Sequence, residues 1–595
     1  MASVMLRTPP ETLIHTLSYL SWRELLSAQR ISRAFQELIR SAVELQYIIE
    51  LGADEFVRND KDNANVLAQA HTGTGSGSSG LLTTQDKLTL LLNRRRSWRT
   101  LDFARNMSVR FPGPCFAHKL VADVFAKDGS GAYVDAKHFI AAWLPTRDDD
   151  HDGDLHTDAG GQQPLRMVRD DLPSRTWEFA MDPTQDLLAW LMSDESLNPM
   201  VHVRTLSSHE THPLAVTSPL VFPTAAGSVP GESLTEVLAG TLQIAGDIIG
   251  TVGECGGYYL RIWNWHTGVV LVAQSAKDVD FPTQCSLAFL SPRAYMIASW
   301  GDPGSLDLYE IRDSAASFDT TGPPAHVLSL RLPELRPHRK LDRTITHFSP
   351  YLTNPEALLS SFVKRQDARI QLVHLQYGNA PGPLTQYAYA PGPLTFTLHV
   401  KNEMLLDLMA QVREGRGVAS HCQRILVPTP SAYARYATSG GAPDALPPIE
   451  MYQNVLAWEW WGPRYTRFLQ QDDQLFQHSD VNGHRAAFCP GRPTDTKLCI
   501  FDFNVHPKRT DDPCNLGLDN GDEENRRWTY EVHTEETVLL EQDLFVAPVI
   551  SSLPYAVSRR TDMSGYDKFL IDDQRLVGVK HSSGDAQCDI DVFTL

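Results

Sequence analysis

Apolar and polar positions follow two different patterns along this chain. Up to Leu51, apolar residues recur every three or four positions, as in Leu13, Leu17 and Leu20, which is the spacing of one helix face. From about Trp98 onward, short apolar runs alternate with Gly, Pro, Asp and Asn, which is typical of strands joined by turns. The patterns predict an α+β multidomain protein with helices first and a mainly-β region after them.

The first fifty residues contain signals for three helices. Thr8 is predicted to cap the first helix, with Pro9 at its first helical position, and Ser21 and Glu24 have the spacing of a capping box for the second. A third helix and its continuation carry the apolar positions Ile31, Phe35, Leu38, Ile39, Leu45, Ile48, Ile49 and Leu51. Helices this short form a marginal core. They are either a cap docked on the main domain or a module that lends its leucines to a partner's groove.

Four segments of this region together resemble an F-box: Thr8–Ile14, Leu17–Leu20, Glu24–Leu26 and Arg30–Ile39. The match covers about residues 5 to 50 and departs from the family pattern at Thr8, Glu24, Ser32 and Phe35, where leucine, aspartate, cysteine or valine, and tryptophan are common. The resemblance implies a three-helix F-box over residues 1–50 that binds the Skp-type adaptor of cullin-RING ubiquitin ligases. The adaptor-binding residues it implies are Pro9, Pro10, Leu13, Ile14, Leu17, Leu20, Leu25, Leu26, Ile31 and Phe35.

A second resemblance extends along the chain to a large group of basidiomycete fungal F-box proteins, whose C-terminal parts are propeller-like and whose substrates are generally unassigned. The similar segments are Leu45–Leu51, Arg95–Phe103, Asp182–Leu188, Ile262–Gly268 and Phe501–Pro507. The resemblance implies a non-catalytic substrate-recognition subunit of an SCF-type E3 ubiquitin ligase with an unknown protein substrate. The alternatives are an F-box scaffold or regulator that does not promote ubiquitination, and an enzyme built on a propeller.

The rest of the chain divides into a linker and one long β-rich domain. Residues 51–97 are predicted to be a linker with a flexible Gly/Ser-rich segment at 71–80 and a helix over 85–97, and residues 98–595 the substrate-recognition domain. The clearest strands are Asp247–Val252, Tyr258–Trp263 and Val269–Val272, and the segment Trp263–Gly268 resembles the end of a WD-type blade. Repeated meanders of this kind favour a β-propeller over a two-sheet sandwich, with seven or eight blades of about 40–70 residues.

Charge and cysteine usage narrow the class of protein. With 53 basic and 72 acidic side chains among 595 residues, the net charge of -19 disfavours partners such as nucleic acid or an anionic membrane. The run Arg94–Arg96 is interpreted as a solvated helix face. The eight cysteines are scattered without a CxxC pair and are expected to be reduced and mostly structural. No apolar run is long enough to span a bilayer, so we expect a soluble protein of the cytoplasm, the nucleus or both.

No motif predicts catalytic, cofactor-binding or metal-binding residues. The GxGxxG match at 75–80 lies in a Ser/Gly segment without a preceding strand, and His209–His212 has the wrong spacing for HExxH. The acidic run Asp148–Asp154 begins like a calcium loop but has Ala159 where a glutamate is needed, which favours a solvated insertion over a weak cation site. We therefore expect no cofactor and no enzyme activity.

Two further patterns concern the β region. Alternation places Trp458 and Trp460 of the cluster Trp458, Trp460 and Trp461 on one strand face as core, with an exposed recognition anchor as the alternative. The duplicated APGPLT at 380–385 and 390–395 is interpreted as a hairpin in preference to a Pro-rich contact loop.

Overall fold

Seven sheets of four to six strands form the body of the protein in a computed structural model. The structure describes residues 8–59, 82–113, 115, 117–129, 138–144, 166–169, 176–193, 199–222, 238–254, 258–275, 285–300, 303–312, 325–358, 360–379, 393–428, 450–471, 479–489, 498–505, 527–581 and 587–594. The Gly/Ser segment 71–80, the acidic run 148–154 and most of the APGPLT repeat lie outside these residues.

Blades 1 to 3 are four-stranded antiparallel sheets in chain order. Blade 1 contains β3 (Ala117–Val121), β4 (Val124–Asp128), β5 (Phe139–Trp143) and β6 (Arg166–Arg169). Blade 2 contains β7 (Thr176–Asp182), β8 (Leu187–Ser193), β9 (Pro199–Thr205) and β10 (Leu220–Val221), with η2 (Pro183–Gln185) between the first two strands. Blade 3 contains β11 (Leu238–Ala245), β12 (Ile248–Glu254), β13 (Tyr258–Asn264) and β14 (Val269–Ser275), which confirms the three strands predicted there.

Blades 4 and 5 share an inserted segment. Blade 4 contains β15 (Cys285–Ser291), β16 (Ala294–Ser299), β17 (Ser305–Glu310) and β18 (Ala325–Arg331). Blade 5 contains β19 (Arg339–Phe348), β21 (Ile370–Asn379), β22 (Leu394–Lys401) and β25 (Thr466–Gln471), with η3 (Pro355–Ala357) and β20 (Phe362–Lys364) between its first two strands. The insertion between β22 and β25 contains α8 (Asn402–Glu414), η5 (Gly417–His421), β23 (Gln423–Pro428), β24 (Glu450–Leu456) and α10 (Trp458–Tyr465). Strand β24 pairs in parallel with β18 and so extends blade 4.

Blades 6 and 7 complete the ring. Blade 6 contains β26 (Asp480–Asn482), β27 (Arg485–Phe488), β28 (Leu498–Asp502), β32 (Tyr555–Arg560) and β29 (Trp528–His533), and a separate pair contains β30 (Thr537–Leu539) and β31 (Val549–Ser551). Blade 7 contains β33 (Lys568–Ile571), β34 (Arg575–His581), β35 (Gln587–Thr594) and β2 (Arg105–Pro112). The chain therefore closes the ring by pairing a strand near residue 105 with the strand near its C-terminus.

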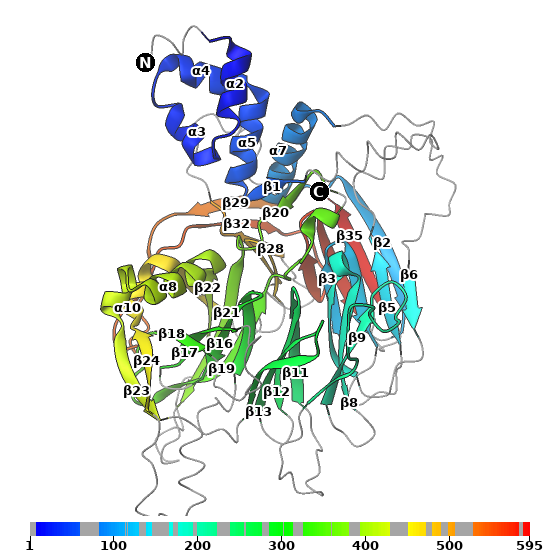
Figure 1. Cartoon of the computed structure of the whole chain (residues 1–595), viewed down its shortest axis with the longest axis vertical. Coiled ribbons are helices and arrows are strands. Elements are labelled where there is room, and N and C mark those ends of the chain that lie inside the picture. Colours follow the sequence, from blue (N-terminus) through cyan, green and yellow to red (C-terminus); the bar gives the residue numbers. More distant parts are fainter. Residues whose placement is uncertain are drawn as a thin grey trace, which may run out of the picture.

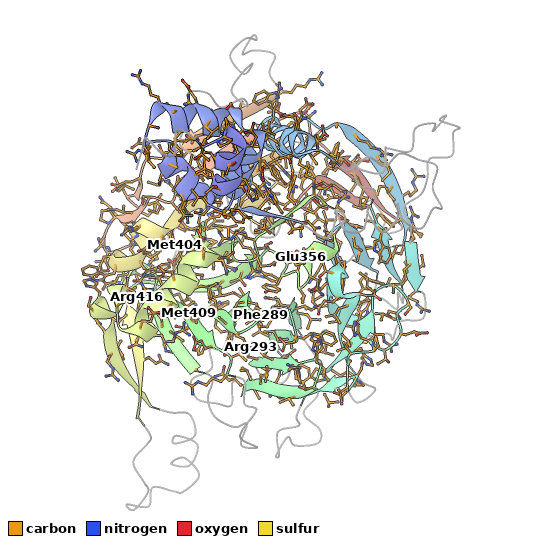
Figure 2. The ribbon with its side chains drawn as sticks, turned by 45° about the horizontal axis from the view of Figure 1, so that its top comes forward. Phe289, Arg293, Glu356, Met404, Met409 and Arg416 are labelled. Carbon is orange, nitrogen blue, oxygen red and sulfur yellow. The ribbon has the colours of Figure 1, made fainter. Side chains whose placement is uncertain are left out.

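The innermost strands show that the ring is closed. Each of β3, β7, β11, β15, β19 and β26 contacts the next, and β33 contacts both β26 and β3. Seven antiparallel sheets in this cyclic order define a seven-bladed β-propeller, at the lower end of the predicted range. Figures 1 and 2 show the blades arranged around a centre, with the N-terminal helices at one end.

An apolar layer lies between each blade and the next, which explains the long apolar runs in the strands. In β8, Leu187, Ala189 and Leu191 face blade 3, whereas Leu188, Trp190 and Met192 face blade 1. Successive side chains of a strand point to opposite faces, so a strand buried on both faces is apolar throughout. In Figure 2, Phe289 and Met409 belong to the layers on the two sides of blade 4.

The N-terminal part consists of five described helices and a short strand. These are α2 (Pro10–Leu17), α3 (Trp22–Ala28), α4 (Arg33–Ser41), α5 (Val43–Ala53), β1 (Phe56–Arg58) and α7 (Thr84–Thr100). We call α2, α3 and α4 the helical module and α5 with α7 the stalk. Strand β1 pairs with β20, and α7 lies against β29 and β32, so the stalk rests on blades 5 and 6 (Figure 1).

Candidate interaction surfaces of the module and the propeller

The helical module begins each helix with a recognisable cap. The Ser21 hydroxyl accepts from the Glu24 N–H at 3.4 Å, and the Glu24 carboxylate accepts from the Ser21 N–H at 2.8 Å, which confirms the predicted capping box. Ser32 caps α4 in the same way, at 3.2 Å from the Phe35 nitrogen. The predicted cap at Thr8 is wrong by one position, because Pro10, which needs no N–H partner, takes the first helical position and Pro9 becomes the N-cap.

A small core holds the module on α5. Its buried side chains come from all four helices and their connections, and they are Leu17, Leu25, Ala28, Ile39, Ala42, Leu45 and Ile49. The continuous third helix predicted through Leu51 is instead two helices, because the backbone leaves the helical region at Ala42. The break lets α4 and α5 fold against each other around this core.

The ten residues implied by the family resemblance divide into three groups. Leu17 and Leu25 are core residues with exposed fractions of 7% and 0%. The half-buried residues that pack against this core are Ile14, Leu20, Leu26 and Phe35. Leu13 is half-buried outside that cluster, and Pro9, Pro10 and Ile31 are exposed.

The exposed apolar residues of the module include one that the sequence comparison did not select. Tyr19 is 78% exposed and Ile31 is 72% exposed, and the Tyr19 ring meets the His15 ring edge-on at 5.2 Å. Together with Pro9, Pro10 and Leu13 they form what we call the exposed apolar set. Tyr19 lies within the matched segment Leu17–Leu20, so its position after the first helix was the available signal.

Buried charges connect the stalk to the propeller. Arg95 of α7 pairs with Glu50 and Asp54 of α5 at 2.8 and 2.9 Å. On the propeller side, Asp573 pairs with Lys364 at 2.7 Å and with Arg94 of α7 at 3.5 Å. The prediction that Arg94–Arg96 is a solvated face is therefore wrong for Arg94 and Arg95, because the face of α7 that carries them is covered by these carboxylates.

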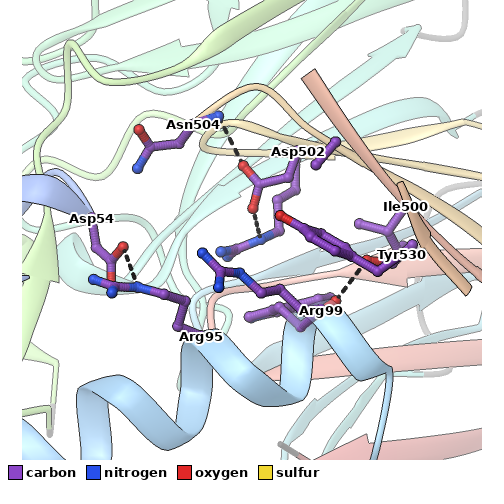
Figure 3. A pocket seen from close by; sticks show the side chains of 11 residues that line it. Asp54, Arg95, Arg99, Ile500, Asp502, Asn504 and Tyr530 are labelled. Atoms are coloured by element: carbon purple, nitrogen blue, oxygen red, sulfur yellow. Dashed lines mark hydrogen bonds and ion pairs between the residues drawn. The ribbon is translucent and has the colours of Figure 1, made fainter. Parts of the chain in front are cut away.

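Aromatic contacts and hydrogen bonds complete the junction, which Figure 3 shows from close by. The Arg485 guanidinium lies 4.7 Å from the Trp98 ring centre and donates to Asp502 at 2.9 Å. The Asn504 amide donates to the Ala53 carbonyl at 3.0 Å. The remaining cavity is about 30 Å³, room for one or two water molecules. The junction is thus a closed contact rather than a ligand pocket.

The charges at the junction shift two carboxyl groups in the same direction. Burial raises the pKa of Asp573, but Lys364 and Arg94 outweigh it and lower that pKa to about 2. Burial likewise raises the pKa of Glu55, and the His484 hydrogen bond and the charges of His484, Lys401 and Arg365 lower it to about 2. Both groups are therefore ionised near neutral pH and attract the cations around them.

A larger cavity of about 180 Å³ lies among the innermost strands. Its polar groups are occupied by neighbours: Lys119 pairs with Glu178 at 3.1 Å, and Asp480 accepts from the Ile571 N–H at 2.7 Å. Burial raises the pKa of Asp480 to about 6. Within the described ranges, no group of three or more His, Cys, Asp or Glu side chains is placed to hold a metal ion.

The tryptophan cluster is a correction. Trp458, Trp460 and Trp461 lie on helix α10 rather than on a strand, and α10 contributes Trp458 (9% exposed) and Trp461 (0% exposed) to the core. Trp460 is 48% exposed and stacks on His421 at 3.6 Å. Positions three apart share a helix face, whereas positions two apart do not, so the predicted pairing of Trp458 with Trp460 as core is wrong.

Comparisons with known proteins give weak similarities only. No family model matches the chain, and no curated protein does. The WD40 domain of Toxoplasma gondii coronin is 9% identical over 83% of this chain and 88% of its own, with a TM-score of 0.33. The WD40 domain of fission yeast SCAP is 7% identical over 82% and 98%, at 0.32, and the computationally designed Ika8 protein 9% over 82% and 98%, at 0.31. At these scores the propeller assignment rests on strand order and ring closure.

One membrane property follows from the helices. None of those in the described part of the chain is both long and apolar enough to cross a bilayer.

Proposed function

We propose that this protein is the substrate-recognition subunit of a cullin-RING ubiquitin ligase of the SCF type. In this proposal the helical module binds the Skp-type adaptor, and the propeller binds a protein substrate. The observation that carries the proposal is the exposed apolar set, because it lies in the segment that resembles an F-box and the propeller does not cover it. Such a subunit would act in the cytoplasm, the nucleus or both.

The exposed apolar set has the properties of a docking surface. Tyr19 and Ile31 leave more than 70% of their surface in water, at 78% and 72%. A helical module with few buried side chains gains most from burying such residues in a partner's groove. Burying an isoleucine side chain contributes about 1.5–3 kcal/mol, so a few of these positions suffice for specific binding.

The stalk supports a two-ended role. Buried ion pairs join α5 to α7 and α7 to the propeller, so a partner on the module is held in a fixed position relative to a partner on the ring. A substrate receptor acts by raising the effective concentration of the substrate near the ubiquitin-charged enzyme. It needs no reacting side chains of its own, and the proposed subunit is therefore non-catalytic.

The test is co-purification of the full chain with a Skp-type adaptor. Ile31→Asp places a charge in the proposed interface, and we expect adaptor binding to fall at least tenfold without loss of the folded state. The matched control is Val216→Asp, at a propeller position that is also exposed, at 76% against 72%. Normal adaptor binding by Ile31→Asp, or equal loss in both variants, would show that the interface assignment is wrong.

Leu20→Asp is a poorer probe than Ile31→Asp. Leu20 packs against the module core, so a charge there also disturbs folding.

The scaffold alternative makes a different prediction from the receptor. Both bind the adaptor, but only a receptor shortens the half-life of the protein that its propeller captures. Capture of partners with proteasome and cullin activity blocked, followed by half-life measurements with and without this chain, separates the two. An enzyme whose helices only cap the ring would not co-purify with the adaptor.

A further inference from the structure

Two cysteines that are far apart in the sequence meet where the propeller ring closes. Cys588 lies on β35 opposite Phe111 of β2, the strand pair that closes the ring. Cys115 lies in the connection from β2 to β3 of blade 1. Their side chains are hydrogen-bonded to each other, and both belong to the apolar layer between blades 7 and 1. All six described cysteines are free thiols.

The surroundings of this pair differ from those of an inert buried thiol. Cys588 is fully buried and Cys115 is half-buried, so small solutes have access to the pair from the Cys115 side. The Cys115 sulfur lies 3.5 Å from Nδ1 of His118. Lys127 donates to the carbonyls of Pro112 and Gly113 at 2.6 and 2.8 Å, which fixes the turn between β2 and Cys115.

The electrostatics of the pair favour one thiolate. The hydrogen bond from Cys115 lowers the pKa of Cys588, burial opposes this, and the nearby Lys127 charge lowers it further. Hydrogen bonding to Cys588 raises the pKa of Cys115, which keeps that proton. A thiolate in contact with a second thiol is the arrangement that disulfide formation requires.

We propose that Cys115 and Cys588 form a reversible disulfide that covalently closes the propeller ring, with hydrogen peroxide as the oxidant. One sulfur attacks a peroxide oxygen, giving a sulfenic acid and one water. The other sulfur then attacks the sulfenic sulfur and releases a second water. Overall, two thiols and one H₂O₂ give one disulfide and two waters, and an external dithiol such as dithiothreitol reverses the bond.

Ring closure gives the disulfide a structural consequence. In the reduced protein, β2 is held to β35 by backbone hydrogen bonds and packing alone. The disulfide would join residues 115 and 588, and thereby hold the first and last blades together even when the strand pair opens. It concerns the ring itself and is independent of the proposed adaptor binding.

The experiment treats the full-length protein with hydrogen peroxide, blocks free thiols, and examines it without reductant. We expect faster migration after denaturation, a Cys115–Cys588 linked peptide by mass spectrometry, a higher Tm and full reversal by dithiothreitol. Cys115→Ser should abolish the migration shift and the linked peptide. Cys422→Ser is the matched control, since Cys422 is also half-buried, and it should keep both.

A second pair serves as an internal control. Cys489 and Cys499 lie on neighbouring strand segments, but Cys489 faces blade 7 and Cys499 faces blade 5, so no link between them is expected. The proposal is overturned if Cys115 is oxidised to sulfinic acid without a linked peptide. It is equally overturned if the shift persists in Cys115→Ser, whose reduced Tm should match that of the wild type.

Discussion

The blades contact one another differently from the way the stalk contacts them. Between blades 1 and 2, the layer contains Phe139, Phe179 and Trp190, whose rings lie 4.7–5.5 Å apart. At the stalk, the contacts are dominated by arginine, lysine and carboxylate groups around Asp573 and Arg95. Apolar packing is non-directional and independent of pH, whereas buried ion pairs require fixed partners and ionised carboxylates. The ring therefore gains its stability from shape, and the module its placement from charge.

The largest effect is expected in the apolar layers. Trp190→Ala removes a side chain that is 1% exposed and leaves a cavity among rings that cannot collapse fully, so the free energy of unfolding should fall by about 3–5 kcal/mol. Trp460→Ala removes the same side chain where it is 48% exposed, and should cost about 1 kcal/mol or less. Chemical denaturation of both variants checks the difference. Similar losses would mean that burial does not separate these two positions.

These two tryptophans also show what sequence patterns can and cannot predict. The strand around Trp190 is apolar at every position because both of its faces are buried, and such runs with turns between them predicted the propeller. In the cluster at 458–461, apolar positions are too few to distinguish a period of 2 from one of 3.6. The helix there depends on packing against α8, blade 4 and blade 5, which no local pattern records.

The module and the junction differ in the same respect. Ser21 and Glu24 are three residues apart, so their capping box could be predicted from spacing. Arg94 and Asp573 are far apart in the sequence, and only the closed ring brings them together. The same holds for Cys115 and Cys588. The exposed state of Ile31 and the buried state of Leu25 could not be distinguished either, since both are apolar positions in one matched motif.

The second largest effect is expected at the junction. Asp573→Asn leaves Lys364 and Arg94 without their carboxylate, and the free energy of unfolding should fall by about 2 kcal/mol, since the Asp573 side chain is 30% exposed and water screens part of the interaction. Asp562→Asn is the matched control, because Asp562 is 29% exposed and pairs with Arg560 outside the junction. We expect a loss of less than 1 kcal/mol there. Equal losses would remove the distinction between junction and surface.

Acid should weaken the junction before the apolar layers. The pKa of Glu55 is about 2 in the folded protein and about 4.3 in an unfolded chain, so its stabilisation is present above about pH 4 and is lost as the pH falls toward 2. The side chain is 14% exposed, and the loss should amount to about 2 kcal/mol. Thermal unfolding at several pH values should show a shallower acid slope in Glu55→Gln than in the wild type. Identical slopes would contradict the shifted pKa.

The smallest effect tests whether the module unfolds apart from the ring. Ser21→Ala removes the cap of α3 and should cost about 1 kcal/mol locally, while Ser27→Ala in the same helix removes a hydroxyl that only donates back to the Arg23 carbonyl at 2.9 Å and should cost less. The module has its own small core on α5, separate from the seven layers between blades. Hydrogen exchange should therefore quicken in α3 of Ser21→Ala and stay unchanged in the blades. Faster exchange throughout the ring would mean that module and propeller unfold as one unit, and that the charged junction couples them as tightly as the apolar layers couple the blades.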